Sequence, residues 1–109
     1  MEEITNIYAV YCKDENGITI LKKAYKSRLD AYKYVISKII TLLNIIDTEF
    51  KSSENRVLPV GAQVIFTLFH MKDGSYIEQY DYFKDNYKNF FRYVGKPAIM
   101  FFVSPLQLV

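Results

Sequence analysis

The hydrophobic and polar positions divide the chain into two similar stretches. In each stretch an apolar run leads to a short polar turn, and a second run ends in a triplet of an aromatic residue, a lysine and a residue suited to cap a helix. The triplets are residues 25–27 (Tyr-Lys-Ser) and 83–85 (Phe-Lys-Asp), and a helical pattern follows each of them. The pattern predicts two hairpin-plus-helix units, which together form a degenerate internal repeat.

The first unit occupies residues 1–50. Its first strand is predicted at Ile4–Cys12, where both alternating sets of side chains are apolar, as in a strand that is covered on both faces. Asn16 and Gly17 tolerate positive φ and predict a tight turn. The chain then returns as a second strand at Ile18–Tyr25.

The clearest helical pattern in the chain begins after Ser27, a favourable N-cap residue. Apolar residues recur at spacings of three and four, at Leu29, Tyr32, Ile36, Ile39, Leu43, Ile46 and Phe50. This predicts an amphipathic helix of about six turns, roughly 33 Å long. A five-stranded sheet is only roughly 20–25 Å wide. We therefore expect the end of the helix, with Ile45, Ile46 and Phe50, to project beyond the sheet and to be available to a partner.

A polar connector is predicted at residues 51–61, where Pro59 and Gly61 argue against a central strand. The second unit, residues 62–109, follows it. A short helix is predicted to begin at an Asp85 cap and to end at Gly95. The remaining apolar runs predict three strands, at Ala62–Met71, Ser75–Tyr82 and Ala98–Val103.

These elements predict a single α+β domain over residues 1–109. Its mostly antiparallel sheet would have about five strands, from two ββα units and a final strand, covered by one long and one short helix. Half of the residues are hydrophobic and 17% are aromatic, which excludes a disordered chain. The N-terminus lacks the pattern of a signal peptide, and the most apolar stretch, Ile36–Ile46, is too short to cross a bilayer. We therefore expect a cytoplasmic protein that does not bind membranes.

Few residues could carry catalytic chemistry. His70 is the sole histidine and Cys12 the sole cysteine, so the chain offers neither a two-histidine metal site nor an internal disulfide. Cys12 and His70 form the one conceivable nucleophile–base pair, because each ends the first strand of its unit. Both residue types are more often structural. The sequence also lacks a glycine-rich phosphate loop, and we expect a non-enzymatic protein without cofactor or metal.

Tyrosine is the most informative residue type for function. The chain has 10 tyrosines, too many to bury in a domain of this size, and exposed tyrosines are enriched at binding surfaces. We expect a small protein–protein interaction module, acting alone or as a homodimer. The amino-acid composition follows the bias of AT-rich codons. This suggests a viral or phage accessory protein that binds a factor in the host cytoplasm, or else a virion or assembly component. The candidate partner-binding residues are Tyr34, Ile45, Tyr76, Tyr80 and Tyr82.

The alternative is a protein that binds nucleic acid. Basic residues recur at intervals of four at Lys84, Lys88, Arg92 and Lys96, and three more, Lys22, Lys23 and Lys26, lie before the long helix. With Tyr76, Tyr80 and Tyr82 of the predicted strand Ser75–Tyr82, they predict a basic, aromatic-lined surface. Such a series also occurs on ordinary solvated helix faces. The net charge is only +2 and the pI about 8.6, below the value above 9 that is typical of a nucleic-acid-binding domain. Protein binding is therefore the preferred hypothesis.

Overall fold

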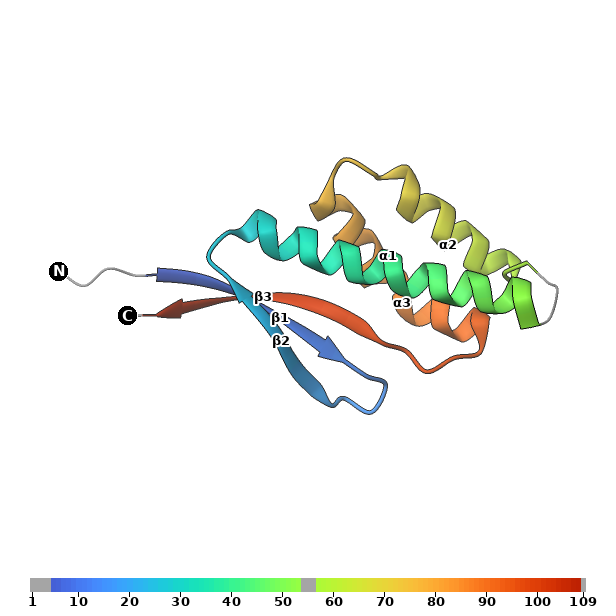
Figure 1. Cartoon of the computed structure of the whole chain (residues 1–109), viewed down its shortest axis with the longest axis horizontal. Helices are drawn as coiled ribbons and strands as arrows, with labels where there is room; N and C mark the ends of the chain where they lie inside the picture. Colours follow the sequence, from blue (N-terminus) through green and yellow to red (C-terminus); the bar gives the residue numbers. More distant parts are fainter. Residues whose placement is uncertain (1–4, 54–56, 109) are drawn as a thin grey trace.

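The computed structural model describes residues 5–53 and 57–108 and contains an open sheet packed against helices (Figure 1). Within these residues there are three strands and three helices in the order ββαααβ. The elements are β1 (Thr5–Lys13), β2 (Thr19–Tyr25), α1 (Arg28–Ser53), α2 (Val60–Met71), α3 (Tyr76–Val94) and β3 (Met100–Leu108). They form one small α+β domain.

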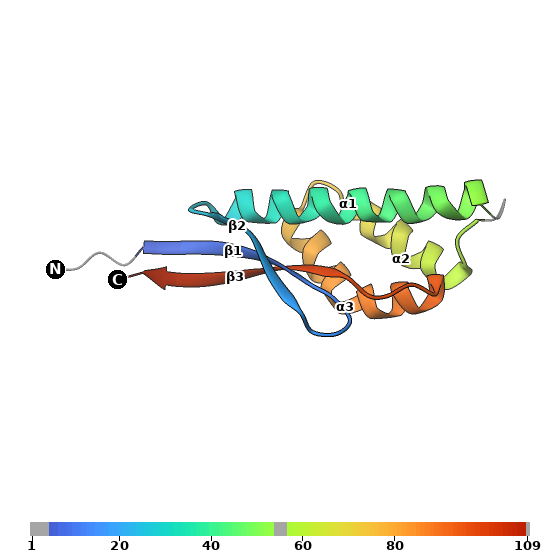
Figure 2. The same cartoon turned by 60° about the horizontal axis from the view of Figure 1, so that its bottom comes forward.

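The sheet is antiparallel with strand order β2-β1-β3, so β1 lies in the centre. Its hairpin turn is held by Asp14, whose side chain accepts the N–H groups of Asn16 and Ile18, while Gly17 adopts the positive φ of 82°. β3 pairs with the whole of β1, but β2 pairs with it only from Tyr8 onward. The start of β1 and the end of β3 therefore form a two-stranded ribbon that projects beyond the helices (Figures 1 and 2).

Helix α1 begins as the sequence predicts. The Ser27 hydroxyl accepts the N–H of Asp30 at 3.2 Å and caps the first turn. The helix lies along the sheet and contacts all three strands as well as α3 (Figure 2). It buries five residues of the predicted apolar stripe, Tyr32, Ile36, Ile39, Leu43 and Ile46, together with Ala31 and Val35, but Leu29 is 50% exposed and Phe50 is half-buried. The first hairpin and the long helix are thus confirmed.

The predicted strand at Ala62–Met71 is wrong, because this segment forms α2. Its buried residues Ala62, Ile65 and Phe69 are spaced by three and four, which is a helical stripe. The opposite side is apolar as well, and a run that is apolar on every side gives no period by which to distinguish a strand from a helix. Pro59 directly precedes the first turn. The N–H that proline lacks would have no acceptor within the helix at this position, so no hydrogen bond is lost.

The predicted strand at Ser75–Tyr82 is also wrong. Helix α3 begins at Tyr76, and Ser75 is its N-cap, accepting the N–H of Glu78 at 3.4 Å. A serine followed three residues later by glutamate is the pattern of a capping box, and it marks this start in the sequence. Asp85, the predicted cap, lies in the middle of the helix. The predicted end is confirmed, since Gly95 adopts a left-handed φ of 68° after Val94.

These two changes remove the second ββα unit and the internal repeat. The described residues contain three strands instead of about five, and three helices instead of one long and one short helix. The predicted connector at residues 51–61 is also shorter, because α1 continues to Ser53 and α2 starts at Val60; residues 54–56 lie outside the described residues. The last strand starts at Met100 and continues through Pro105.

The hydrophobic core lies between the helices and one face of the sheet. Its largest fully buried side chains are those of Phe69, Phe83, Phe90 and Phe91, from α2 and α3. Ile46 is only 3% exposed and belongs to this core together with Leu58 and Ile65. The expected overhang of α1 is therefore wrong at Ile46, because the segment from Leu58 into α2 packs where a partner was predicted.

Candidate functional site

The predicted partner-binding residues do not form a common surface. Tyr80 is only 4% exposed, and its ring meets that of Tyr32 edge to face at 5.1 Å. The Tyr80 hydroxyl accepts the N–H of Val103 at 3.2 Å, which ties α3 to β3. Burial raises the pKa of this hydroxyl above its ordinary value, although the hydrogen bond from Val103 opposes the shift. Tyr80 is therefore a core residue.

Tyr34, Tyr76 and Tyr82 are half-buried and lie on helices instead of one strand face. Tyr34 packs against Tyr25 of β2, with 5.8 Å between ring centres. Each of the three rings has a lysine ammonium over it, contributed by different parts of the chain: Lys23 and Lys38 for Tyr34, Lys33 for Tyr76 and Lys72 for Tyr82. Burial also raises the pKa of the Tyr82 hydroxyl. The three tyrosines therefore contact different lysines, and none of these lysines is shared between them.

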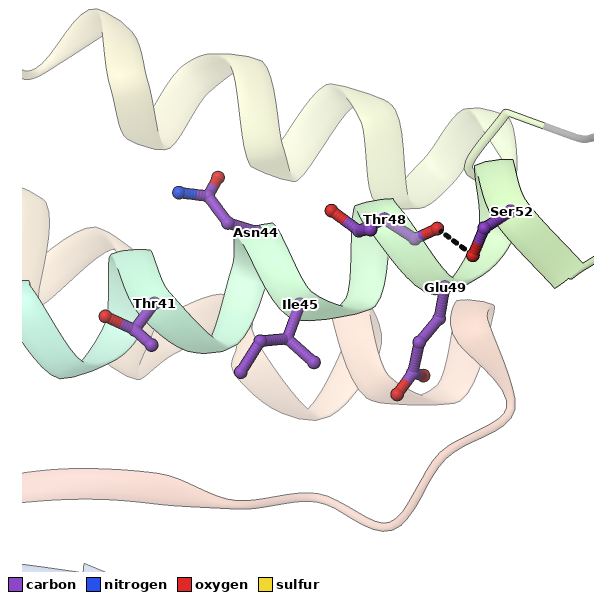
Figure 3. A pocket seen from close by; sticks show the side chains of 6 residues that line it. All are labelled: Thr41, Asn44, Ile45, Thr48, Glu49 and Ser52. Carbon is purple, nitrogen blue, oxygen red and sulfur yellow. Dashed lines mark hydrogen bonds between the residues drawn. The ribbon is translucent and has the colours of Figure 1, made fainter.

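Ile45 is exposed, as the sequence predicts, but its surroundings are polar. It lies in a shallow, open depression on the outer side of α1 (Figure 3), which is lined by Thr41, Asn44, Ile45, Thr48, Glu49 and Ser52. The Ser52 hydroxyl donates to the Thr48 carbonyl at 2.8 Å, so this polar group is already satisfied within the helix. Ile45 is the one hydrophobic residue among the six that line this depression.

The predicted basic series is divided by its surroundings. Lys84, Lys88 and Arg92 lie on α3, but Lys96 forms an ion pair with Glu49 of α1 at 2.6 Å. Lys88 lines a depression together with the β1–β2 turn, which carries Asp14 and Glu15. Acidic side chains thus offset part of this charge, and these four residues do not form one uniformly basic face.

Cys12 and His70 belong to different layers of the fold. Cys12 lies in β1, where its neighbours across the ladder are Ile20 and Phe101. His70 is in α2, and its ring lies edge-on to those of Phe66 and Phe69. The nucleophile–base hypothesis required both residues to end equivalent strands, but His70 lies on a helix.

No group of three or more His, Cys, Asp or Glu side chains in residues 5–53 and 57–108 could hold a metal ion. In that part of the chain, no helix is both long and apolar enough to span a membrane.

One exposed apolar surface was not predicted from the sequence. It is the α2 outer face, which we define as Val60, Val64, Leu68 and Met71, all on one side of the helix. Val60 is 77% exposed, Met71 74% and Val64 50%. The open depression beside them is lined only by uncharged residues of α2, at Val60, Gln63, Val64, Thr67 and Leu68. From Val57 to Met71 the sequence holds no Asp, Glu, Lys or Arg, which is the signal that could have revealed this face.

The backbone of α2 is held close to α3 beneath this face. A Cβ atom placed on Gly61 would lie 2.6 Å from ring atoms of Tyr93, so α3 approaches α2 where α2 has no side chain. Farther along, the side-chain amide of the buried Gln79 donates to the carbonyl of Phe69. Two contacts near opposite ends of α2 thus fix the orientation in which its outer side chains are exposed.

Comparisons with protein-family models, with curated proteins and with solved structures found no match to the chain.

Proposed function

We propose that this protein is a non-enzymatic protein–protein interaction module that binds its partner on the α2 outer face. One observation supports the proposal most directly: a helix packed in the core on one side keeps an uncharged, apolar surface on the other. A helix that is apolar all round is normally buried. Its exposed half is therefore expected to be covered in the functional assembly.

The chemistry of this face indicates the kind of partner. Two valines, a leucine and a methionine offer apolar area but few hydrogen-bonding groups, and methionine adapts its shape to different partners. Burying one such side chain typically contributes ~1.5–3 kcal/mol. The partner should accordingly present an apolar groove or helix face. Because the α2 outer face carries no charge, a second copy of the chain would not be repelled from it and is one candidate partner.

A matched pair of substitutions tests the proposal. Val64→Asp places a charge in the α2 outer face, whereas Ile45→Asp makes a comparable change on α1, and both side chains are 50% exposed. Tagged wild-type and variant proteins would be compared for the proteins they retain from a lysate and for their sedimentation coefficients. We expect Val64→Asp to weaken partner binding at least tenfold and Ile45→Asp to change it less than twofold, with unchanged circular dichroism for both.

The result distinguishes the alternatives. A wild-type dimer that Val64→Asp converts to a monomer would identify the partner as a second copy. A different protein that is lost only with Val64→Asp would identify a heterologous partner. If both variants retain the same proteins in the same amounts as the wild type and sediment alike, the α2 outer face is not a binding surface and the proposal is wrong.

A further inference from the structure

The positive charge of the chain is concentrated in one short segment. Residues 18–38 contain six basic residues and one acidic residue, Asp30, a net charge of +5. The whole chain has a net charge of only +2, so the remaining residues together carry −3. The modest overall pI therefore conceals a strongly basic region. The basic residues are Lys22, Lys23, Lys26, Arg28, Lys33 and Lys38.

The fold brings the centre of this segment together. β2 ends at Tyr25, α1 begins at Arg28 and passes over the sheet, and the two elements are in contact. Across the β1–β2 ladder Lys23 is opposite Val10 and Tyr25 is opposite Tyr8, so Lys23 and Tyr25 point to the same face of the sheet. Tyr34 of α1 packs against Tyr25 there. We define the basic–tyrosine surface as Lys22, Lys23, Tyr25, Lys26, Tyr34 and Lys38.

Two lysines of this surface, Lys23 and Lys38, lie against its tyrosine rings. The ammonium of Lys23 lies 5.1 Å from the ring centre of Tyr25 and 5.8 Å from that of Tyr34. The ammonium of Lys38 lies 5.3 Å from the Tyr34 ring centre. Such contacts are within the range of cation–π attraction. They hold the cations beside the rings without neutralising them.

Described carboxylates do not neutralise these cations either. The ion pairs formed among residues 5–53 and 57–108 are Lys51 with Asp47 and Lys96 with Glu49. Lys22, Lys23, Lys26 and Lys38 are all solvent-exposed. Like charges held close together repel one another, and a bound polyanion would remove that cost while releasing its own counterions.

We propose that the basic–tyrosine surface binds single-stranded nucleic acid. Each nucleotide of a single strand supplies a phosphate and an unpaired base with a flat face, which correspond to the lysines and the tyrosine rings. A duplex stacks its bases internally and would use only the lysines. An acidic peptide supplies carboxylates but no regular series of aromatic faces. The site lies on β2 and the first half of α1, and so is distinct from both the α2 outer face and the basic series on α3.

An anionic bilayer matches this surface less well. The hairpin tip next to β2 carries Asp14 and Glu15, which an anionic membrane would repel.

The proposal is tested by fluorescence anisotropy with labelled 20-nucleotide DNA and RNA single strands of mixed sequence. We expect binding whose log K falls with log salt at a slope of about −3, because four lysines contact phosphates at roughly −0.7 each. Lys23→Glu/Lys38→Glu should weaken binding at least tenfold. Lys88→Glu/Arg92→Glu makes the same change in net charge on α3 and should weaken it less than threefold. Lys22→Glu/Lys26→Glu is a second, independent variant expected to behave like the first.

Stacking has its own readout. Tyr34→Leu should weaken binding three- to tenfold at an unchanged salt slope, whereas Tyr34→Phe should stay within twofold of the wild type. If Lys23→Glu/Lys38→Glu and Lys88→Glu/Arg92→Glu lose equal affinity, the binding site is not located at the basic–tyrosine surface. Equal competition by a duplex of the same sequence would overturn the preference for single strands. Absence of salt-dependent binding, or binding only to phosphatidylserine vesicles, would overturn the proposal as a whole.

Discussion

At the scale of single residues, this structure assigns several side chains a structural role that their chemistry alone would not suggest. Tyr80 has the residue type of a binding surface but is buried, and its hydroxyl satisfies the N–H of Val103. His70 has the residue type of a general base but packs against two phenylalanines. Residue type therefore suggested candidates, and only burial and contacts separated core residues from exposed ones.

Cys12 is predicted to be an unreactive thiol. Burial raises its pKa above the ordinary value, and Asp14 raises it further, whereas Lys22 lowers it by less than burial raises it. Because a raised pKa leaves less thiolate at any given pH, alkylation should be slower than that of a free model cysteine at neutral pH. The pH at which the alkylation rate reaches half its maximum should be higher as well. Iodoacetamide kinetics between pH 7 and 10 would measure both, and a rate above that of free cysteine would contradict this prediction.

At the scale of elements, both edges of the sheet carry features that oppose pairing with another strand. β2 contains an irregularity: Lys23 is opposite Val10 and Leu21 is opposite Tyr11, which leaves Lys22 unpaired in the ladder. A bulge and lysines are common protections of an edge strand.

β3 is protected differently. The N–H of Val103 points away from β1 and donates to the Tyr80 hydroxyl. Because N–H directions repeat every two residues along a strand, position 105 also faces the open edge. That position is Pro105, which has no N–H to donate to another strand. These features favour a partner on α2 over a partner that extends the sheet.

The start of α3 can be tested by two substitutions. Ser75→Ala removes the N-cap that accepts the N–H of Glu78 and should lower the free energy of unfolding by about 1 kcal/mol. Asp85→Ala replaces an exposed residue in the middle of the helix by a better helix former, and should leave stability unchanged or raise it by up to ~0.7 kcal/mol. Urea denaturation followed by circular dichroism measures both. The opposite order would place the start of the helix at Asp85.

At the scale of the whole molecule, the hydrophobic core and the two proposed binding surfaces occupy different parts of the fold. The helices bury one continuous core, the α2 outer face lies on the far side of α2 from that core, and the basic–tyrosine surface lies on β2 and α1. The two proposed binding surfaces share no residue. Substitutions in one should therefore leave binding at the other unchanged.

The way in which the C-terminal half of α1 is covered gives a further prediction. Ile46 belongs to the core with Leu58 and Ile65, whereas its neighbour Ile45 faces solvent. Ile46→Ala should lower the free energy of unfolding by ~2–5 kcal/mol, because it removes buried methylene groups and leaves a cavity. Ile45→Ala should change it by less than ~0.5 kcal/mol. Thermal or urea denaturation would compare the two, and similar losses for both variants would mean that this part of α1 is covered on both sides.

What the sequence determined by itself was local. Turn and cap residues such as Gly17, Ser27 and Gly95 act within a few residues of chain, and the amphipathic stripe of α1 has a single clear period, so the first hairpin and the long helix were predictable. The capping box at Ser75 was equally local and was overlooked.

The tertiary structure decided the rest. Whether Ala62–Met71 is a strand or a helix depends on which neighbours bury it, because the segment is strongly apolar throughout. The two candidate surfaces likewise depend on spatial arrangement. One exists because α3 covers only one side of α2, and the other because α1 places Tyr34 and Lys38 beside β2, contacts between segments whose proximity no local pattern encodes.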